Sequence, residues 1–190
     1  DTVVRDGGIT RHAAIPQARF DALQSRRRSL AGRSGCGLCG VESLYAALRP
    51  VPGVAPARPT DAAAIHAAVR ALDGAQLLNA RSGGVHAAAF VHDGGLLVRE
   101  DVGRHNALDK LVGAMARASL DPHAGFAVIT SRASYEMVHK AATAGIALLV
   151  AMSAPTDLAV RTALDAGVTL LGFARDGGFN VYAHAGALRG

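Results

Sequence analysis

The two cysteines of the chain, Cys36 and Cys39, form a C-x-x-C pair inside a glycine-rich stretch, residues 32–40. Glycine gives the backbone conformational freedom, including positive φ, and has no Cβ to shield a neighbouring side chain. We therefore expect a mobile loop that presents its sulfur atoms. The nearby Arg33 favours the thiolate, which is the nucleophilic form of cysteine. The pair predicts a free, reactive thiol site.

Three other uses of a C-x-x-C pair fit this sequence less well. A structural zinc ion needs four ligands, and neither a second C-x-x-C nor an H-x-x-x-H motif accompanies the pair. A thioredoxin-like pair follows a strand, but residues 25–29 (Ser-Arg-Arg-Arg-Ser) do not have the pattern of a buried strand. A structural disulfide would be out of place in a chain with the features of a cytosolic protein.

The composition indicates a globular protein with an ordinary hydrophobic core. Of the 190 residues, 50% are hydrophobic and 18% are charged, so a core of normal size can be buried. Tryptophan is absent and aromatic residues make up 4%, so small aliphatic side chains must fill the core. The sequence has neither an apolar run of membrane-spanning length nor an opening signal peptide. We expect a soluble, cytoplasmic protein without a membrane partner.

The net charge of +5 leaves two interpretations open. Excess positive charge is typical of proteins with polyanionic partners, but an alanine- and arginine-rich composition also results from genomic base bias. The arginines are scattered apart from residues 26–28, and aromatic residues do not alternate with them as in single-stranded nucleic-acid sites. We expect no nucleic-acid partner, whereas an arginine that binds the phosphate of a small ligand remains possible.

From residue 60 onward, helical and strand patterns alternate. Helices are expected at 61–73 (capped by Thr60 and stopped by Gly74), 106–118, 134–144 and 156–166. Strands are expected at 87–91, 96–98, 126–129, 146–151, 169–173 and, at an edge, 180–182. The region before residue 60 is expected to contain a strand at 2–4, a short polar-apolar segment at 19–23, a brief helix at 41–48 and a proline-rich linker at 51–59.

Continuous apolar strands separated by helices favour a largely parallel sheet that is covered on both faces. The turn residues at 93–95 add one antiparallel hairpin. The sequence therefore predicts an α/β protein, a three-layer α/β/α sandwich with a mixed sheet. Residues 1–59 would form an N-terminal region with the cysteine loop and the linker, and residues 60–190 an α/β core.

Polar residues follow the expected strands, where ligands of such sheets usually bind. Arg104 and His105 lie in the first cluster, residues 100–106, and Arg132 lies in the second, residues 131–134. Asn106 and Ser134 can equally be ordinary helix caps. Residues 175–178 form a flexible turn with an arginine, which suits the base or the phosphates of a nucleotide. His86, alone at the start of an apolar strand, has the pattern of a core histidine.

These segments together resemble the formate dehydrogenase accessory sulfurtransferase family (FdhD). Order and spacing agree from about Ser34 to Tyr182, and the run Glu-Asp-Val-Gly-Arg-His-Asn-Ala-Leu-Asp-Lys at 100–110 is highly specific. The other matching stretches are 35–40, 84–88, 131–138, 153–160, 172–173 and 180–182. Family members also carry a segment ahead of this region, which we expect this chain to lack.

The resemblance implies a fold like that of cytidine deaminases, but without their zinc. The chain has no H-x-E near Asn106 and no P-C-x-x-C at Ser134, so the resemblance implies neither zinc nor deaminase chemistry. The family is usually homodimeric. Its guanine dinucleotide-binding stretch matches six consecutive residues, although the internal ones vary: Phe173, Ala174, Arg175, Asp176, Gly177 and Gly178.

The resemblance also implies sulfur relay for formate dehydrogenase. A cysteine desulfurase would pass sulfur to Cys36 as a persulfide, and Cys39 would assist or resolve it. The acceptor would be the molybdenum cofactor bis-(molybdopterin guanine dinucleotide), held in a groove that Arg104, His105 and Arg132 line. The alternative is a chaperone that binds this cofactor and uses its cysteines only as redox groups or zinc ligands.

Overall fold

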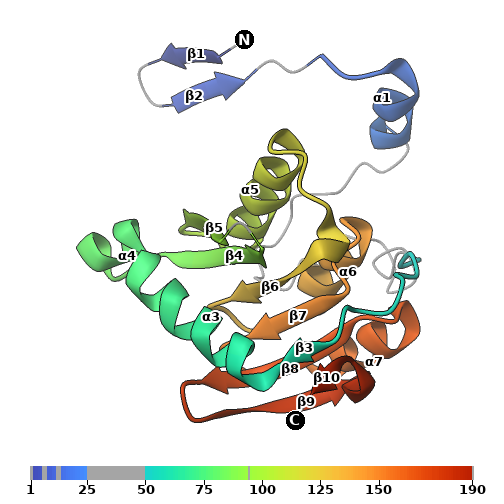
Figure 1. Ribbon diagram of the computed structural model, residues 1–190. Helices are drawn as coiled ribbons and strands as arrows, with labels where there is room; N and C mark the ends of the chain where they lie inside the picture. The colour runs from blue at the N-terminus through green and yellow to red at the C-terminus, as the bar shows by residue number, and fades with distance from the viewer. Residues whose placement is uncertain (1, 6–7, 12–13, 25–49, 94, 190) are drawn as a thin grey trace. The chain divides into compact units, whose positions relative to one another are not determined.

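The computed structural model describes residues 2–5, 8–11, 14–24, 50–93 and 95–189. By its internal contacts the chain divides into two compact units, Asp1–Leu48 and Arg49–Gly190. The predicted helix at 41–48 and both cysteines lie outside the described residues. Figure 1 shows the elements of both units.

The first unit contains a small hairpin and one helix. Strand β1 (Thr2–Arg5) pairs antiparallel with β2 (Gly8–Arg11), which confirms the strand predicted at 2–4. Helix α1 (Gln17–Gln24) forms from the polar-apolar segment around residues 19–23, and its exposed Gln17 amide donates to the Asp21 carboxylate at 2.8 Å.

The second unit is built on a six-stranded mixed sheet. In spatial order its strands are β5 (Gly95–Asp101), β4 (His86–His92), β6 (Gly125–Ile129), β7 (Leu148–Ala151), β8 (Thr169–Arg175) and β9 (Gly178–Ala183). Only the pairs β6–β7 and β7–β8 are parallel. The expectation of a largely parallel sheet with one antiparallel pair is wrong. Short turns join β4 to β5 and β8 to β9, so both pairs are antiparallel. The longer connection through α5 places β6 beside β4, and this pair is antiparallel as well.

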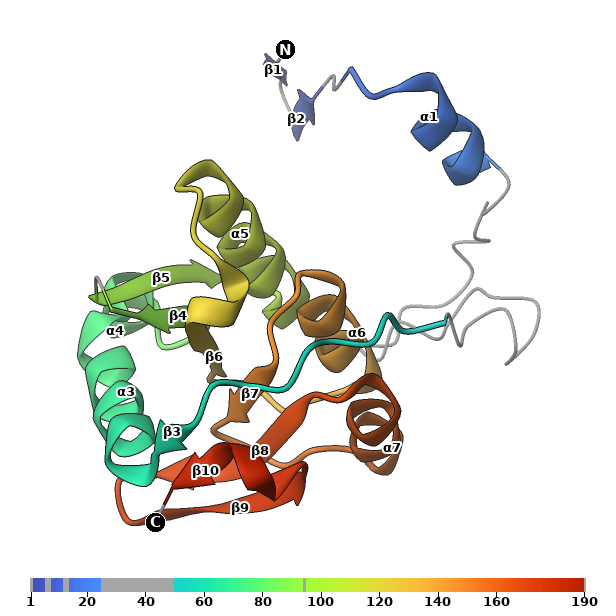
Figure 2. The same cartoon turned by 45° about the vertical axis from the view of Figure 1, so that its right-hand side comes forward.

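Helices cover both faces of this sheet, which confirms the three-layer α/β/α sandwich. Figure 2 shows α3 on one side of the sheet and α5, α6 and α7 on the other. Their bounds are α3 (Ala62–Ala75), α5 (Arg104–Arg117), α6 (Tyr135–Thr143) and α7 (Asp157–Ala166). Smaller elements complete the unit: α4 (Leu77–Ser82), η1 (Pro122–Ala124), η2 (Ala185–Ala187), and β3 (Thr60–Asp61), which pairs in parallel with β10 (Leu188–Arg189).

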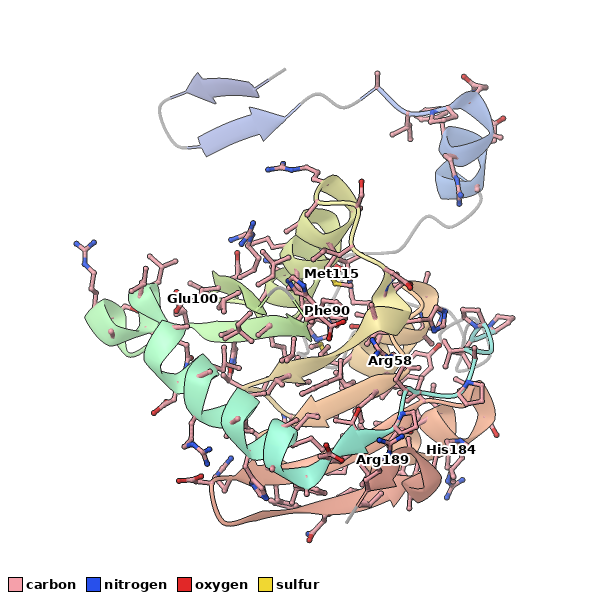
Figure 3. All side chains as sticks on the ribbon, in the orientation of Figure 1. Arg58, Phe90, Glu100, Met115, His184 and Arg189 are labelled. Carbon is pink, nitrogen blue, oxygen red and sulfur yellow. The ribbon has the colours of Figure 1, made fainter. Side chains whose placement is uncertain are left out.

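Strands β6 and β7 carry no polar side chain because both of their faces are buried. In β6, Ala127 and Ile129 belong to the core cluster beneath α5, α6 and α7, whereas Phe126 and Val128 belong to the cluster beneath α3. Phe90 of β4 and Met115 of α5 lie in the first cluster, between the sheet and the helix (Figure 3). The alternation of small and medium side chains thus lets a core with few aromatic residues fill both layers.

Some helix ends differ from the sequence predictions. Thr60 does not cap α3, because it is paired in β3; Asp61 occupies the N-cap position without a side-chain cap bond. Gly74 does not stop the helix, which continues to Ala75. At α7 the predicted cap is confirmed: Thr156 Oγ1 accepts from the N–H of Ala159 at 3.2 Å. Among the described residues, no helix combines the length and the apolar character needed to cross a bilayer.

We expect Leu72→Ala to destabilise the fold by about 2–5 kcal/mol, because the side chain is fully buried in the cluster beneath α3 and its removal leaves a cavity. The matched control is Leu77→Ala in α4, where the same residue type is 73% exposed and the expected change is within about 0.5 kcal/mol. Urea unfolding of both variants measures the difference. Equal destabilisation would contradict the assignment of the core.

Candidate functional site

Four predicted polar clusters meet at one edge of the sheet. Strand β5 runs in the same direction as β6, because both pair antiparallel with β4, and β6, β7 and β8 are parallel. The carboxyl ends of β5, β6, β7 and β8 therefore lie at the same edge, together with the start of β4. These ends carry Glu100–Asp101, Ser131–Arg132, Ser153–Thr156 and Arg175–Asp176. The sequence prediction of a shared polar edge is confirmed.

The carboxylates of the first cluster have structural partners. Glu100 accepts from the N–H groups of Leu78 and Asn79, both at 2.9 Å, and so caps the start of α4 (Figure 3). Asp101 accepts from the N–H of Gly103 at 2.9 Å and is 2.5 Å from Lys110 Nζ. These two carboxylates therefore stabilise the local structure at this edge of the sheet, because their hydrogen bonds are made within the protein.

Asn106 is not the N-cap of the following helix. Helix α5 begins two residues earlier, with Gly103 at the N-cap position. The Asn106 amide instead donates to Asp101 at 3.2 Å from inside the first turn. Asp101, Asn106 and Lys110 thus fix the start of α5, and this places Arg104 and His105 in its first turn.

His105 forms a half-buried pair with a residue that the sequence did not single out. Its Nδ1 lies 2.9 Å from Glu136 Oε2, in the first turn of α6, and the two side chains are 25% and 20% exposed. The pair joins the two helices that follow β5 and β6. The other ring nitrogen, Nε2, is buried without a hydrogen-bond partner in the protein.

Arg104, His86 and Ser134 add polar groups at the same edge. Burial lowers the pKa of His86, and the positive charge of Arg104 lowers it further, so the neutral ring is favoured there. Ser134 is the N-cap of α6, but its buried Oγ caps no amide and has no hydrogen-bond partner. Arg132, between β6 and α6, is exposed. The arginines bring positive charge to the α5–α6 side of the edge, and Ser134 Oγ brings a hydroxyl without a hydrogen-bond partner.

The β8–β9 turn has an unusual backbone. Phe173, near the end of β8, has φ = 53°, a region that L-residues rarely adopt; the residue is 46% exposed, whereas Ala174 is fully buried. The register of β8 and β9 shifts between Gly172 and Arg175. Gly172 admits no side chain, since a Cβ would lie 2.8 Å from Pro155 Cδ. The irregularity therefore turns an aromatic ring outward at the polar edge.

The two charged residues at the end of β8 and in the following turn, Arg175 and Asp176, have different partners within the protein. Arg175 Nη1 donates to the carbonyl oxygens of Met152 and Ala174, so this group supports the ends of β7 and β8. Asp176 is paired with Arg70 of α3. Gly177 and Gly178 have open space around them. Arg70 could not be recognised from the sequence, because no motif surrounds it.

Two surface cavities among the described residues lie away from this turn. A groove of about 710 Å³ runs between α4, β5 and α5 and includes Glu100 and Lys110. A second, of about 350 Å³, lies between residues 54–57, the end of α7 and η2. In the described part of the chain no three His, Cys, Asp or Glu side chains are grouped to hold a metal ion.

Fold and edge together define a three-layer α/β protein whose polar groups gather at the carboxyl ends of its strands. The family described as FdhD/NarQ matches residues 3–189, and the chain belongs to this family. It is 50% identical over 191 residues to the "Sulfur carrier protein FdhD" of Bordetella petrii, an alignment that covers 100% of this chain and 69% of the relative. The protein of the same name from Xanthomonas campestris pv. campestris is 55% identical over 179 residues, which cover 93% and 64%.

A crystal structure also shares this fold. It is that of a putative formate dehydrogenase accessory protein from Desulfotalea psychrophila, with a TM-score of 0.66 and 27% sequence identity over 72% of this chain and 60% of that one. The chain thus spans about two thirds of the length of these curated relatives. The similarity to cytidine deaminases stays a prediction.

We expect Asp101→Asn to lower stability at pH 7 by roughly 1 kcal/mol, because the half-exposed Lys110 loses its carboxylate partner. The bond from Lys110, followed by those from Gly103 and Asn106, holds the pKa of Asp101 below its usual value. Its stabilisation is therefore complete above about pH 4 and is lost as the pH falls through the lower, folded-state pKa.

Thermal unfolding between pH 7 and pH 2 checks this prediction. The gap between wild type and Asp101→Asn should close on acidification. Asp93→Asn is the control, because that side chain is 92% exposed and its distance to Arg58 is 3.8 Å. A gap of constant size at all pH values would show that the charge of Asp101 is not what stabilises the fold.

Proposed function

We propose that this protein is a sulfur carrier that serves formate dehydrogenase. The observation that carries the proposal is the C-x-x-C pair, Cys36 and Cys39, inside the family-matched region of a chain whose relatives are named sulfur carrier proteins. The Desulfotalea psychrophila protein that shares the fold is described as a formate dehydrogenase accessory protein, which supports the same process.

The chemistry that we propose is transfer of a sulfane sulfur by thiolate attack. The Cys36 thiolate attacks the outer sulfur of a persulfide on a cysteine desulfurase. A new S–S bond forms on Cys36 as the donor's S–S bond breaks, and the donor cysteine leaves as a thiolate. No external oxidant or reductant is needed. Arg33, three residues before Cys36, favours the attacking anion. Cys39 would assist the exchange or resolve the persulfide.

The molybdenum cofactor bis-(molybdopterin guanine dinucleotide) is the proposed sulfur acceptor. Its pterin and phosphate groups would lie along the polar edge, where Arg104 and Arg132 offer positive charge and where His105 follows Arg104 in the first turn of α5. Its guanine end would bind at residues 173–178, where the outward ring of Phe173 is available for stacking on a base. We propose a homodimer as the functional form.

Cys36→Ala should abolish sulfur uptake, because the attacking sulfur is removed. The measurement is the intact mass of the protein after incubation with a cysteine desulfurase and cysteine: the wild type gains one or more sulfur atoms and Cys36→Ala gains none. Cys39→Ala is the matched control and should retain most of the uptake. Sulfur uptake by Cys36→Ala would rule out Cys36 as the persulfide-bearing residue. A wild type that gains no sulfur would favour the alternative function, a chaperone that binds the cofactor.

The proposed nucleotide site should prefer guanine. Calorimetry should show GDP binding at least about tenfold more tightly than ADP, since a site built to hydrogen-bond one base leaves its polar groups unpaired with another. Phe173→Ala should weaken GDP, and the exposed Leu164→Ala, on α7, serves as a control. Equal affinities for GDP and ADP would rule out a guanine site at this turn.

A further inference from the structure

We propose that Arg70 of α3 is the side chain that binds a phosphate of the guanine nucleotide, and that Asp176 holds it in place when no nucleotide is bound. This inference rests on the guanine site proposed above for residues 173–178. It adds a residue about one hundred positions away in the sequence, which the contact with Asp176 brings to the turn.

Helix α3 is fixed to the β8–β9 turn by contacts that precede Arg70 by one helical turn. His66 Nδ1 lies 3.0 Å from the carbonyl oxygen of Arg175, and the His66 ring is 5.4 Å from the ring of Phe179. Residues four apart lie on the same face of a helix, so this anchor directs Arg70 to the same turn. The guanidinium of Arg70 there forms an ion pair with Asp176.

Among the described basic side chains at this turn, Arg70 is the one bonded to an anion. Arg175 Nη1 donates to two backbone carbonyl oxygens, and His66 faces a third. The contacts of Arg175 and of His66 stabilise the turn, and each side chain would lose its own contact if it bound a ligand instead. The Asp176 carboxylate, in contrast, is an oxyanion that a phosphate group can replace, because both accept charge-assisted hydrogen bonds from a guanidinium.

The surroundings of the ion pair allow this exchange. The side chains of Arg70 and Asp176 are 56% and 67% exposed, and an exposed ion pair contributes little to stability, so separating it costs little. A Cβ placed on Gly177 or Gly178 would contact nothing within 4 Å, so the turn leaves room for a ligand. Phe173, which lies in β8 three residues before Asp176, is exposed, and its ring would take the base.

Calorimetry of the full chain with GDP and with guanosine tests this role, because only GDP carries phosphates. Arg70→Ala should weaken GDP by about tenfold or more, the effect of one charge-assisted bond, and leave guanosine affinity unchanged. Arg70→Lys should retain part of the GDP affinity, since it keeps the charge but loses the bidentate geometry. The control is Arg161→Ala, which removes another exposed ion pair, with Asp157 at 3.0 Å, and should leave both affinities unchanged.

Asp176→Asn tests the competing contact. The affinity for GDP should rise by about two- to fivefold, because Arg70 no longer has to break an ion pair with Asp176 before it binds the phosphate. Unchanged or weaker GDP binding by this variant would overturn the holding role of Asp176.

The remaining outcomes separate this inference from the guanine site itself. Unchanged GDP affinity in Arg70→Ala overturns the inference while the guanine site stands. An equal loss for GDP and guanosine also overturns it, because Arg70 would then only shape the turn. If the wild type binds neither ligand, the guanine site fails, and the inference fails with it before any variant is compared.

Discussion

The burial of both faces of the central strands is the constraint on which the rest of the structure depends. Strands β6, β7 and β8 lie between α3 and the layer of α5, α6 and α7, so the side chains between their ends must be apolar. Polar groups can then occur only where the strands end. Because these strands share one direction, their polar ends meet at a single edge, and the chemistry available to this unit is concentrated there.

The same constraint explains what could be predicted from the sequence. Runs such as 126–129 and 146–151 are apolar without a break, so the strands, the intervening helices and the three layers follow from the pattern. The direction of pairing depends on contacts between distant segments, and so the place of β6 beside β4 was missed. Thr60 has the type of a helix cap, but its pairing with Leu188, near the other end of the chain, takes precedence over that local preference.

The run 100–110 shows how far a motif alone identifies a site. The Glu100 carboxylate accepts from a backbone amide of α4, and Lys110 binds both the Asp101 carboxylate and the Glu100 carbonyl oxygen. The charges of these three residues therefore stabilise the fold. His105 is different, because its pairing with Glu136 leaves a buried nitrogen without a partner. The sequence placed these residues at the correct edge. The sequence could not distinguish residues that stabilise the fold from residues that could bind a ligand. That distinction depends on partners such as Glu136, which no local sequence pattern marks.

The positive charge of the chain is likewise best understood from its contacts. In β5, an edge strand of the described sheet, Arg99 donates to the carbonyl oxygen of Val98 at 2.6 Å and Lys110 to that of Glu100 at 3.1 Å. These cations satisfy backbone acceptors that would otherwise invite another strand, which disfavours extension of the sheet at this edge. The net charge therefore overstates how many cationic side chains can bind an anionic ligand. A side chain that leaves a backbone carbonyl oxygen to bind a ligand leaves that oxygen without a hydrogen bond. A side chain that leaves an exposed carboxylate does not, because water can solvate the carboxylate.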